Sequence, residues 1–193
     1  MSTEPNSIES KIIQAAIECI EKYGIQHTTN RKVAEMAGVN SAAINYYFRS
    51  KDALVNRCMQ VTLENAFDIR DFDLLAAGSA RERCIAIFDH LITGGLNYPG
   101  ITRAHMYSLL VEGRYDTAAV AKLNGFVEDL VKDIEARNAG MSHEQLILAC
   151  AQMTMATMMA ILAPRLFAGK LGVDLNHAET RRLYVERLVT GLL

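Results

Sequence analysis

The stretch TNRKVAEMAGVNSAAINYYFRSK, residues 29–51, has the pattern of two short helices joined by a tight turn. Apolar residues recur at helical spacing on each side of Gly38, and Asn40 can cap the start of the second helix. Because glycine readily adopts the left-handed conformation that ends a helix, Gly38 marks the turn. The pattern predicts a helix-turn-helix, whose second helix is held out so that its exposed face can enter the major groove of DNA.

The same spacing predicts the two faces of the second helix. Ile44 and Phe48 point inward. Thr29 is predicted to cap the first helix, so that free backbone N–H groups and basic side chains lie together in its first turn, an arrangement that suits a phosphate. The outward-facing residues of the second helix are Ser41, Ala42, Asn45, Tyr46 and Arg49.

The run AGVNSAAINYYFRSKDAL also resembles the signature of the tetracycline-repressor (TetR) family of bacterial transcription regulators. The shared features are a small residue, Gly-Val, a capping residue, an aromatic run ending in Phe, and then Ser-Lys-acid-x-Leu. The resemblance covers residues 8 to about 56. Asn45 stands where the family most often has Tyr, and Tyr47 where it often has His. Because both positions usually face DNA in the family, these departures concern the operator sequence and leave the fold unchanged.

The resemblance implies an all-α protein with a helix-turn-helix DNA-binding domain at residues 1–56 and a ligand-binding and dimerisation domain at residues 57–193. A long helix that begins at Lys51 is expected to join them. By transfer from the family motif, the residues expected to face bases or sugars are Arg31, Ala42, Ala43 and Tyr46. Those expected to hold phosphates are Thr29, Asn30, Asn45, Tyr47 and Lys51, and Ser41 completes the expected DNA-binding set.

Composition agrees with such a protein. Half of the 193 residues are hydrophobic, which is enough for a substantial core. The net charge of −2 does not by itself indicate a nucleic-acid-binding protein, but residues 25–57 hold five basic and only two acidic side chains. Phosphate binding requires a local basic surface, so this segment is the better guide.

The four cysteines, Cys19, Cys58, Cys84 and Cys150, are scattered without CxxC spacing. We interpret them as reduced core thiols of a cytoplasmic protein, with a redox sensor as the alternative. The polar first residues, followed by an amphipathic run, do not form a signal peptide.

Before the DNA-binding stretch, Asn6 and Glu9 have the spacing of a capping box, and the predicted first helix, which ends at Gly24, has one apolar face made of Ile8, Ile12, Ala16, Ile20 and Tyr23. Ser50 is predicted to cap the long helix, and residues 71–79 are interpreted as a linker to the second domain.

Beyond the linker, the periodicity predicts helices at about 79–97, 101–112, 116–138, 142–168 and 176–192, and no strand. Asp116 is expected to cap the third of these helices, and Asn176, with Glu179 at capping-box spacing, is expected to cap the last. Leu146–Ala163 is nearly continuously apolar. A membrane span is one interpretation, and a helix buried on all sides is the favoured one, with one face on its own domain and another on a partner chain. The resemblance implies a homodimer through the last two helices.

The sequence contains no P-loop, GxGxxG, GxSxG or HExxH motif and no His or Cys pair at metal-ligand spacing, so we expect no enzymatic activity, metal or cofactor. An unknown small-molecule effector and double-stranded operator DNA are the expected partners, with no membrane. Bulky apolar residues that could line an effector pocket are Phe88, Leu91, Met106, Tyr107, Leu110, Phe126 and Met153. Ordinary core packing is the alternative for these seven, and a helical protein-interaction or adaptor module is the alternative for the whole chain.

Overall fold

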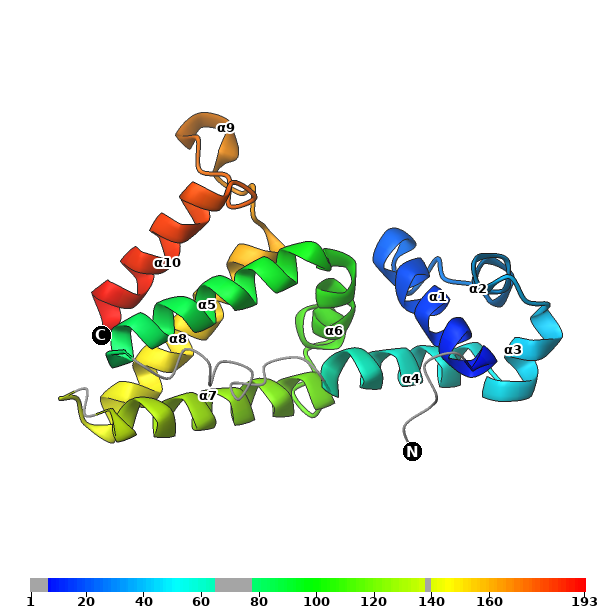
Figure 1. Cartoon of the computed structure of the whole chain (residues 1–193), viewed down its shortest axis with the longest axis horizontal. Coiled ribbons are helices and arrows are strands. Elements are labelled where there is room, and N and C mark those ends of the chain that lie inside the picture. Colours follow the sequence, from blue (N-terminus) through cyan, green and yellow to red (C-terminus); the bar gives the residue numbers. More distant parts are fainter. Residues whose placement is uncertain (1–6, 65–77, 138–139) are drawn as a thin grey trace. The chain divides into compact units, whose positions relative to one another are not determined.

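The computed structural model describes residues 7–64, 78–137 and 140–193 (Figure 1). Within these ranges every regular element is a helix, and one isolated bridge joins Phe167 to Val173. The all-α fold class is therefore confirmed. The helices are α1 (Ile8–Tyr23), α2 (Asn30–Ala37), α3 (Ser41–Phe48), α4 (Lys51–Glu64), α5 (Ala80–Asn97), α6 (Pro99–Glu112), α7 (Ala118–Ala136), α8 (His143–Leu162), α9 (Ala168–Leu171) and α10 (Ala178–Leu192).

The helices belong to two compact units. Unit 1 contains α1 to α4 together with residues 100–113, which are nearly all of α6, and unit 2 contains α5 and α7 to α10. The expected domain boundary between residues 56 and 57 thus falls inside α4. The helix α6 joins unit 1 because Ile101 is buried in its core and Ala104 packs against that core. Linear patterning cannot detect such a return of the chain.

The core of unit 1 forms around α1. Ile12, Ala16 and Ile20 are fully buried on one face of this helix, as the periodicity predicted. Ile44 of α3 and Leu54 of α4 are buried in the same cluster. Since the burial of each large aliphatic side chain contributes about 1.5–3 kcal/mol, this cluster holds the helix-turn-helix against its support.

The predicted helix starts in unit 1 are confirmed at three positions and wrong at one. The side chains of Thr29, Asn40 and Ser50 accept the N–H groups of the third following residue, as capping requires. The cap of α1, however, is Ser7, whose hydroxyl accepts the N–H of Ser10, and not Asn6, which lies outside the described residues. The continuation of α4 beyond Glu64 also lies outside them, as do residues 71–77 of the linker predicted at residues 71–79. Ser79, the last residue of that predicted linker, caps α5.

Two predicted caps in unit 2 are wrong as well. Thr117, not Asp116, caps α7 by accepting the N–H of Val120. The last helix begins after His177 without a side-chain cap. Asn176 lies one residue before the cap position, and its own N–H and its side-chain amide both donate to Asp174.

The central helix of unit 2 is α8, which has the length and hydropathy of a membrane span. However, one side of α8 lies in the unit 2 core, so α8 packs as a core helix. Its buried residues there include Leu146, Cys150, Met153 and Ile161. It ends at Leu162, earlier than predicted, because the ring of Pro164 disfavours the helical conformation at the preceding residue, Ala163.

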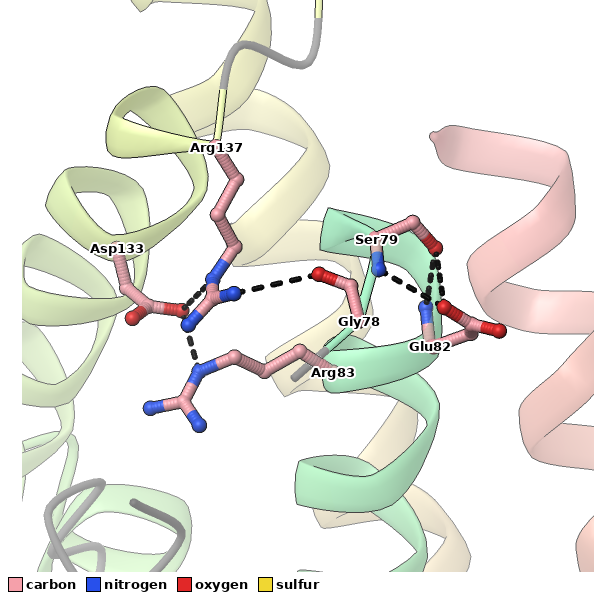
Figure 2. Close-up of polar contacts among 6 residues, drawn as sticks. All are labelled: Gly78, Ser79, Glu82, Arg83, Asp133 and Arg137. Atoms are coloured by element: carbon pink, nitrogen blue, oxygen red, sulfur yellow. Dashed lines mark hydrogen bonds and ion pairs between the residues drawn. The ribbon is translucent and has the colours of Figure 1, made fainter. Parts of the chain in front are cut away.

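A polar cluster joins the start of α5 to the end of α7 (Figure 2). One carboxylate oxygen of Asp133 accepts from Nε of Arg83 at 2.7 Å and from Nε of Arg137 at 3.3 Å. A terminal nitrogen of Arg137 donates to the carbonyl of Gly78. The side chain of Arg83 is only 3% exposed, so its ion pair with Asp133 is largely shielded from water.

Candidate DNA-binding surface

The turn between α2 and α3 has the geometry that the sequence predicted. Gly38 is left-handed, with a φ of 66°, and its N–H donates to the carbonyls of Ala34 and Glu35. The N–H of Val39 then donates to the carbonyl of Ala34 at 3.0 Å, which closes the end of α2. This turn fixes the direction in which α3 leaves α2.

The helix α3 has one buried and one exposed face. Ile44 is fully buried and Phe48 is 7% exposed, so these two side chains attach α3 to the unit 1 core. Tyr46 is 80% exposed, and its ring meets the ring of Tyr47 edge to face at 5.2 Å. The exposed positions are Ser41, Ala42, Asn45, Tyr46, Tyr47 and Arg49, while Ala43 is half-buried. The predicted outward face of the helix is thus exposed.

The first turn of α2 lies beside α3. The side-chain amide of Asn30 donates to Oδ1 of Asn45 at 3.3 Å, so the two asparagines expected to hold phosphates are joined to each other. Thr29 and Arg31 are exposed next to them. Together these residues form a polar surface at the start of α2, where the N–H of Lys32 already donates to the side chain of Thr29. The N-terminal end of a helix favours an anion.

Lys32, in the same turn, is held differently from its neighbours. Its ammonium nitrogen donates to the carbonyl of His27 and lies 4.5 Å from the centre of the Tyr23 ring. Both contacts direct its charge toward the end of α1.

The junction between α3 and α4 has a feature that sequence reasoning missed. Arg49 adopts a φ of 59°, which is uncommon for a residue with a side chain, and its N–H donates to the carbonyl of Asn45. Ser50 then caps α4, and Lys51 begins that helix half-buried. The exposed guanidinium of Arg49 and the ammonium of Lys51 therefore follow directly after the exposed face of α3.

The seven residues expected to line an effector pocket lie in two different units. Phe88, Phe126 and Met153 are packed in the unit 2 core, with the rings of Phe88 and Phe126 edge to face at 6.2 Å, and Leu91 packs against that core. The other three lie on α6 in unit 1, where Met106 is buried and Tyr107 and Leu110 are exposed.

All four cysteines are buried and none forms a disulfide. Burial raises the pKa of the Cys58 and Cys84 thiols to about 12 and that of Cys150 to about 11. Since the thiolate is the reactive form, these three thiols have the properties of core residues and not of redox sensors.

Residues 12–58 match the family model of the bacterial regulatory proteins of the tetR family. The chain is also similar to the HTH-type transcriptional regulator BetI of Escherichia coli O17:K52:H18 (strain UMN026 / ExPEC), with 32% identity over 81 residues. This similarity spans 41% of the chain and 42% of BetI.

Two solved structures share the fold over nearly the whole chain. A TetR transcriptional regulator from Legionella pneumophila has a TM-score of 0.68 and 18% identity, covering 97% of this chain and 98% of its own. The transcriptional regulator FadR of Bacillus subtilis, solved in complex with stearoyl-CoA, has a TM-score of 0.63 and 17% identity, covering 94% and 97%. At such identities the similarity concerns the fold alone.

Proposed function

We propose that the chain, whose residues 12–58 match the family model of the bacterial regulatory proteins of the tetR family, is a cytoplasmic DNA-binding transcriptional regulator. In detail, it is a repressor that binds a palindromic operator as a homodimer and is released by a small molecule. The observation that carries this proposal is the α3 helix, which is anchored by Ile44 and Phe48 and leaves its opposite face exposed.

The exposed face of α3 suits direct contact with bases. Ala42 and Tyr46 present apolar and aromatic surface, and Ala43 and Arg31 complete the group that faces bases or sugars. A small apolar side chain can contact a thymine methyl group, and arginine can read guanine through two hydrogen bonds. The sequence preference of the regulator resides in these four residues.

A second group positions the protein on the phosphates. Thr29, Asn30 and Lys51 lie at the starts of α2 and α4, where free N–H groups and a cation favour an anion. Asn45, Tyr47 and Ser41 add side-chain donors on α3. The hydrogen bond between Asn30 and Asn45 supports this role, since it orients both amides before DNA arrives. Such contacts carry affinity without sequence information.

The dimer forms through α8 and α10. Leu148 and Met155 are each 65% exposed and Met159 is 54% exposed, at a spacing that places them on one face of α8. Leu183 of α10 is 57% exposed. An apolar stripe of this size on a core helix needs a cover, and a second copy of the chain supplies it with two-fold symmetry.

The effector enters the apolar interior of unit 2. Phe88, Phe126 and Met153 fill that interior, with Leu91 at its margin. Methionine side chains repack readily, so a ligand can take the place that they occupy. The FadR structure supports the existence of an effector, because that protein shares the fold and was solved in complex with stearoyl-CoA. The three expected pocket residues on α6 belong to unit 1 and are not part of this interior.

A fluorescence-anisotropy titration tests the proposal. The DNA is the promoter fragment next to the gene for this chain, and a scrambled duplex of the same length is the control. We expect saturable binding that resists competitor DNA and weakens steeply as salt rises, because bound phosphates release counterions. Equal affinity for both duplexes at physiological salt would contradict a regulator and favour a helical interaction module.

A further inference from the structure

Unit 1 contains a cavity that plays no part in the proposed DNA contacts. It has a volume of about 450 Å³ and lies between the end of α1, the loop that follows it, and the first turns of α6. Binding sites for small ligands typically enclose about 300–1,000 Å³, so the cavity has the size of such a site. All of its lining residues belong to unit 1.

The walls of the cavity are fixed on both sides. At Gly100, a Cβ atom would lie 2.3 Å from the carbonyl oxygen of Glu21, so only glycine allows α6 to approach α1 so closely. The N–H of Ile101 donates to Oε2 of Glu21 at 2.9 Å. Two turns later, the hydroxyl of Tyr107 accepts from the side chain of Gln26 at 3.2 Å. These contacts hold the two walls in place without a ligand, which lowers the entropic cost of binding one.

The charges that line the cavity favour an anion. Lys22 and Arg103 are exposed at its edge, and among the described residues neither forms an ion pair with a carboxylate. The only acidic group of the lining is Glu21, and its Oε2 atom already accepts the N–H of Ile101. The lining therefore contains the cations of Lys22 and Arg103 and one carboxylate, that of Glu21, which already accepts a hydrogen bond.

The remaining lining favours a flat apolar body. The rings of Tyr23 and Tyr107 stand at the cavity, and Ile25 and Ala104 supply aliphatic surface. We propose that this cavity binds a small organic anion, with its charged group at Arg103 and Lys22 and its flat body between the tyrosines. The site is separate from the effector pocket proposed for unit 2.

The cavity lies next to a contact between α1 and the helix-turn-helix. Tyr23 lines the cavity and its ring also holds the ammonium of Lys32, on the first turn of α2, at 4.5 Å. A ligand that contacts Tyr23 would therefore touch a side chain that itself contacts Lys32 of the helix-turn-helix.

A titration of the ¹⁵N-labelled full chain, followed by NMR, tests the site without requiring DNA binding. The probe is 2-naphthoate, and 2-naphthamide is the control of equal shape without charge. We expect 2-naphthoate to shift the amide signals of Gly24, Ile25 and Gly100 in a saturable manner. We expect 2-naphthamide to bind at least about tenfold more weakly, because it lacks the charge-assisted hydrogen bonds.

Two arginine variants locate the binding. Arg103→Gln should weaken 2-naphthoate binding about tenfold, because it removes the cation and keeps a helix-forming side chain. Arg81→Gln, at an exposed position of α5, changes the net charge equally and should leave the affinity unaltered. The proposal is overturned if the shifts map outside the cavity, if 2-naphthamide binds as tightly as 2-naphthoate, or if the two variants behave alike. Loss of operator binding would not affect this result, so the two proposals fail independently.

Discussion

Asp133 is the residue on which the charge balance of the cluster in Figure 2 depends. It accepts from two arginines, and the side chain of Arg83 is 3% exposed. Removing the carboxylate takes a negative charge away from two arginines, one of them buried, and this costs more than the loss of a surface pair.

We therefore expect Asp133→Asn to lower the free energy of unfolding by about 2–4 kcal/mol. Asp129→Asn, about one turn away on the same helix, is the control, because its ion pair with Lys132 is largely exposed. That change should cost less than about 1 kcal/mol. Urea unfolding followed by circular dichroism at one protein concentration measures both, and equal losses would contradict the assigned role of Asp133.

His105 joins α6 to α4 inside unit 1. Its Nε2 lies 2.9 Å from the hydroxyl oxygen of Thr62, which in turn donates to the carbonyl of Cys58 or Met59. Since the hydroxyl has a single hydrogen, it accepts from His105, so Nε2 of the imidazole carries a proton. Burial lowers the pKa of His105 below its ordinary value of 6.5.

The lowered pKa of His105 predicts how the stability of the folded chain changes with pH. Above about pH 6.5 the histidine is neutral in both the folded and the unfolded chain, and its contribution does not vary with pH. As the pH falls below that value, the unfolded chain binds a proton that the folded chain does not, so stability decreases. Urea unfolding at pH 7.5 and 5.5 should show a smaller pH dependence for His105→Gln than for the unchanged chain. An equal pH dependence of unfolding in the variant and in the unchanged chain would show that groups other than His105 cause it.

At the scale of elements, the sequence located the helices better than their ends. The buried face of α1 and the turn at Gly38 follow from spacing and from glycine chemistry, and both were predicted. The start of α1 was not predicted correctly, because serine and asparagine are both good caps and the sequence alone does not choose between Ser7 and Asn6. Arg49 in a left-handed conformation gives no sequence signal, since residues other than glycine rarely adopt it.

Within the candidate DNA-binding surface, we propose that α3 and the start of α4 have different roles. Tyr46 lies on the exposed face of α3 and Lys51 at the first position of α4. We expect Lys51→Ala to weaken binding to all DNA sequences alike and to lower the salt slope by about one, because one phosphate contact is lost. Tyr46→Ala should instead change the relative affinities for different sequences. Anisotropy titrations over a set of operator variants measure both, and uniform losses from the two changes would contradict the division.

At the scale of the whole molecule, the assignment of α6 to unit 1 is what sequence reasoning could not provide. The helix itself was predicted closely, at 101–112 against Pro99–Glu112. Its partners were not, because periodicity identifies which face of a helix is apolar and not which core receives it. For the same reason the seven expected effector-pocket residues were grouped together although they belong to two units.

The proposed dimer gives a prediction at this scale. Leu148→Glu should convert the dimer to a monomer, because the new carboxylate would lose its water in the interface without a partner. Since Leu148 is 65% exposed in the single chain, the variant should still fold. Leu110→Glu, at a leucine of α6 that is 63% exposed, is the control and should remain dimeric. Light scattering at micromolar concentration measures both masses, and a monomeric unchanged chain would contradict the dimer.

In the proposed function, unit 1 reads a specific DNA sequence and two copies of the chain bind it together. Selection of bound duplexes from a random DNA library, followed by sequencing, tests this directly, because the protein itself chooses the operator. We expect enrichment of a two-fold symmetric sequence whose half-sites lie about one or two helical turns apart, about 34 Å for each turn. A library that remains random after repeated selection at physiological salt would contradict it.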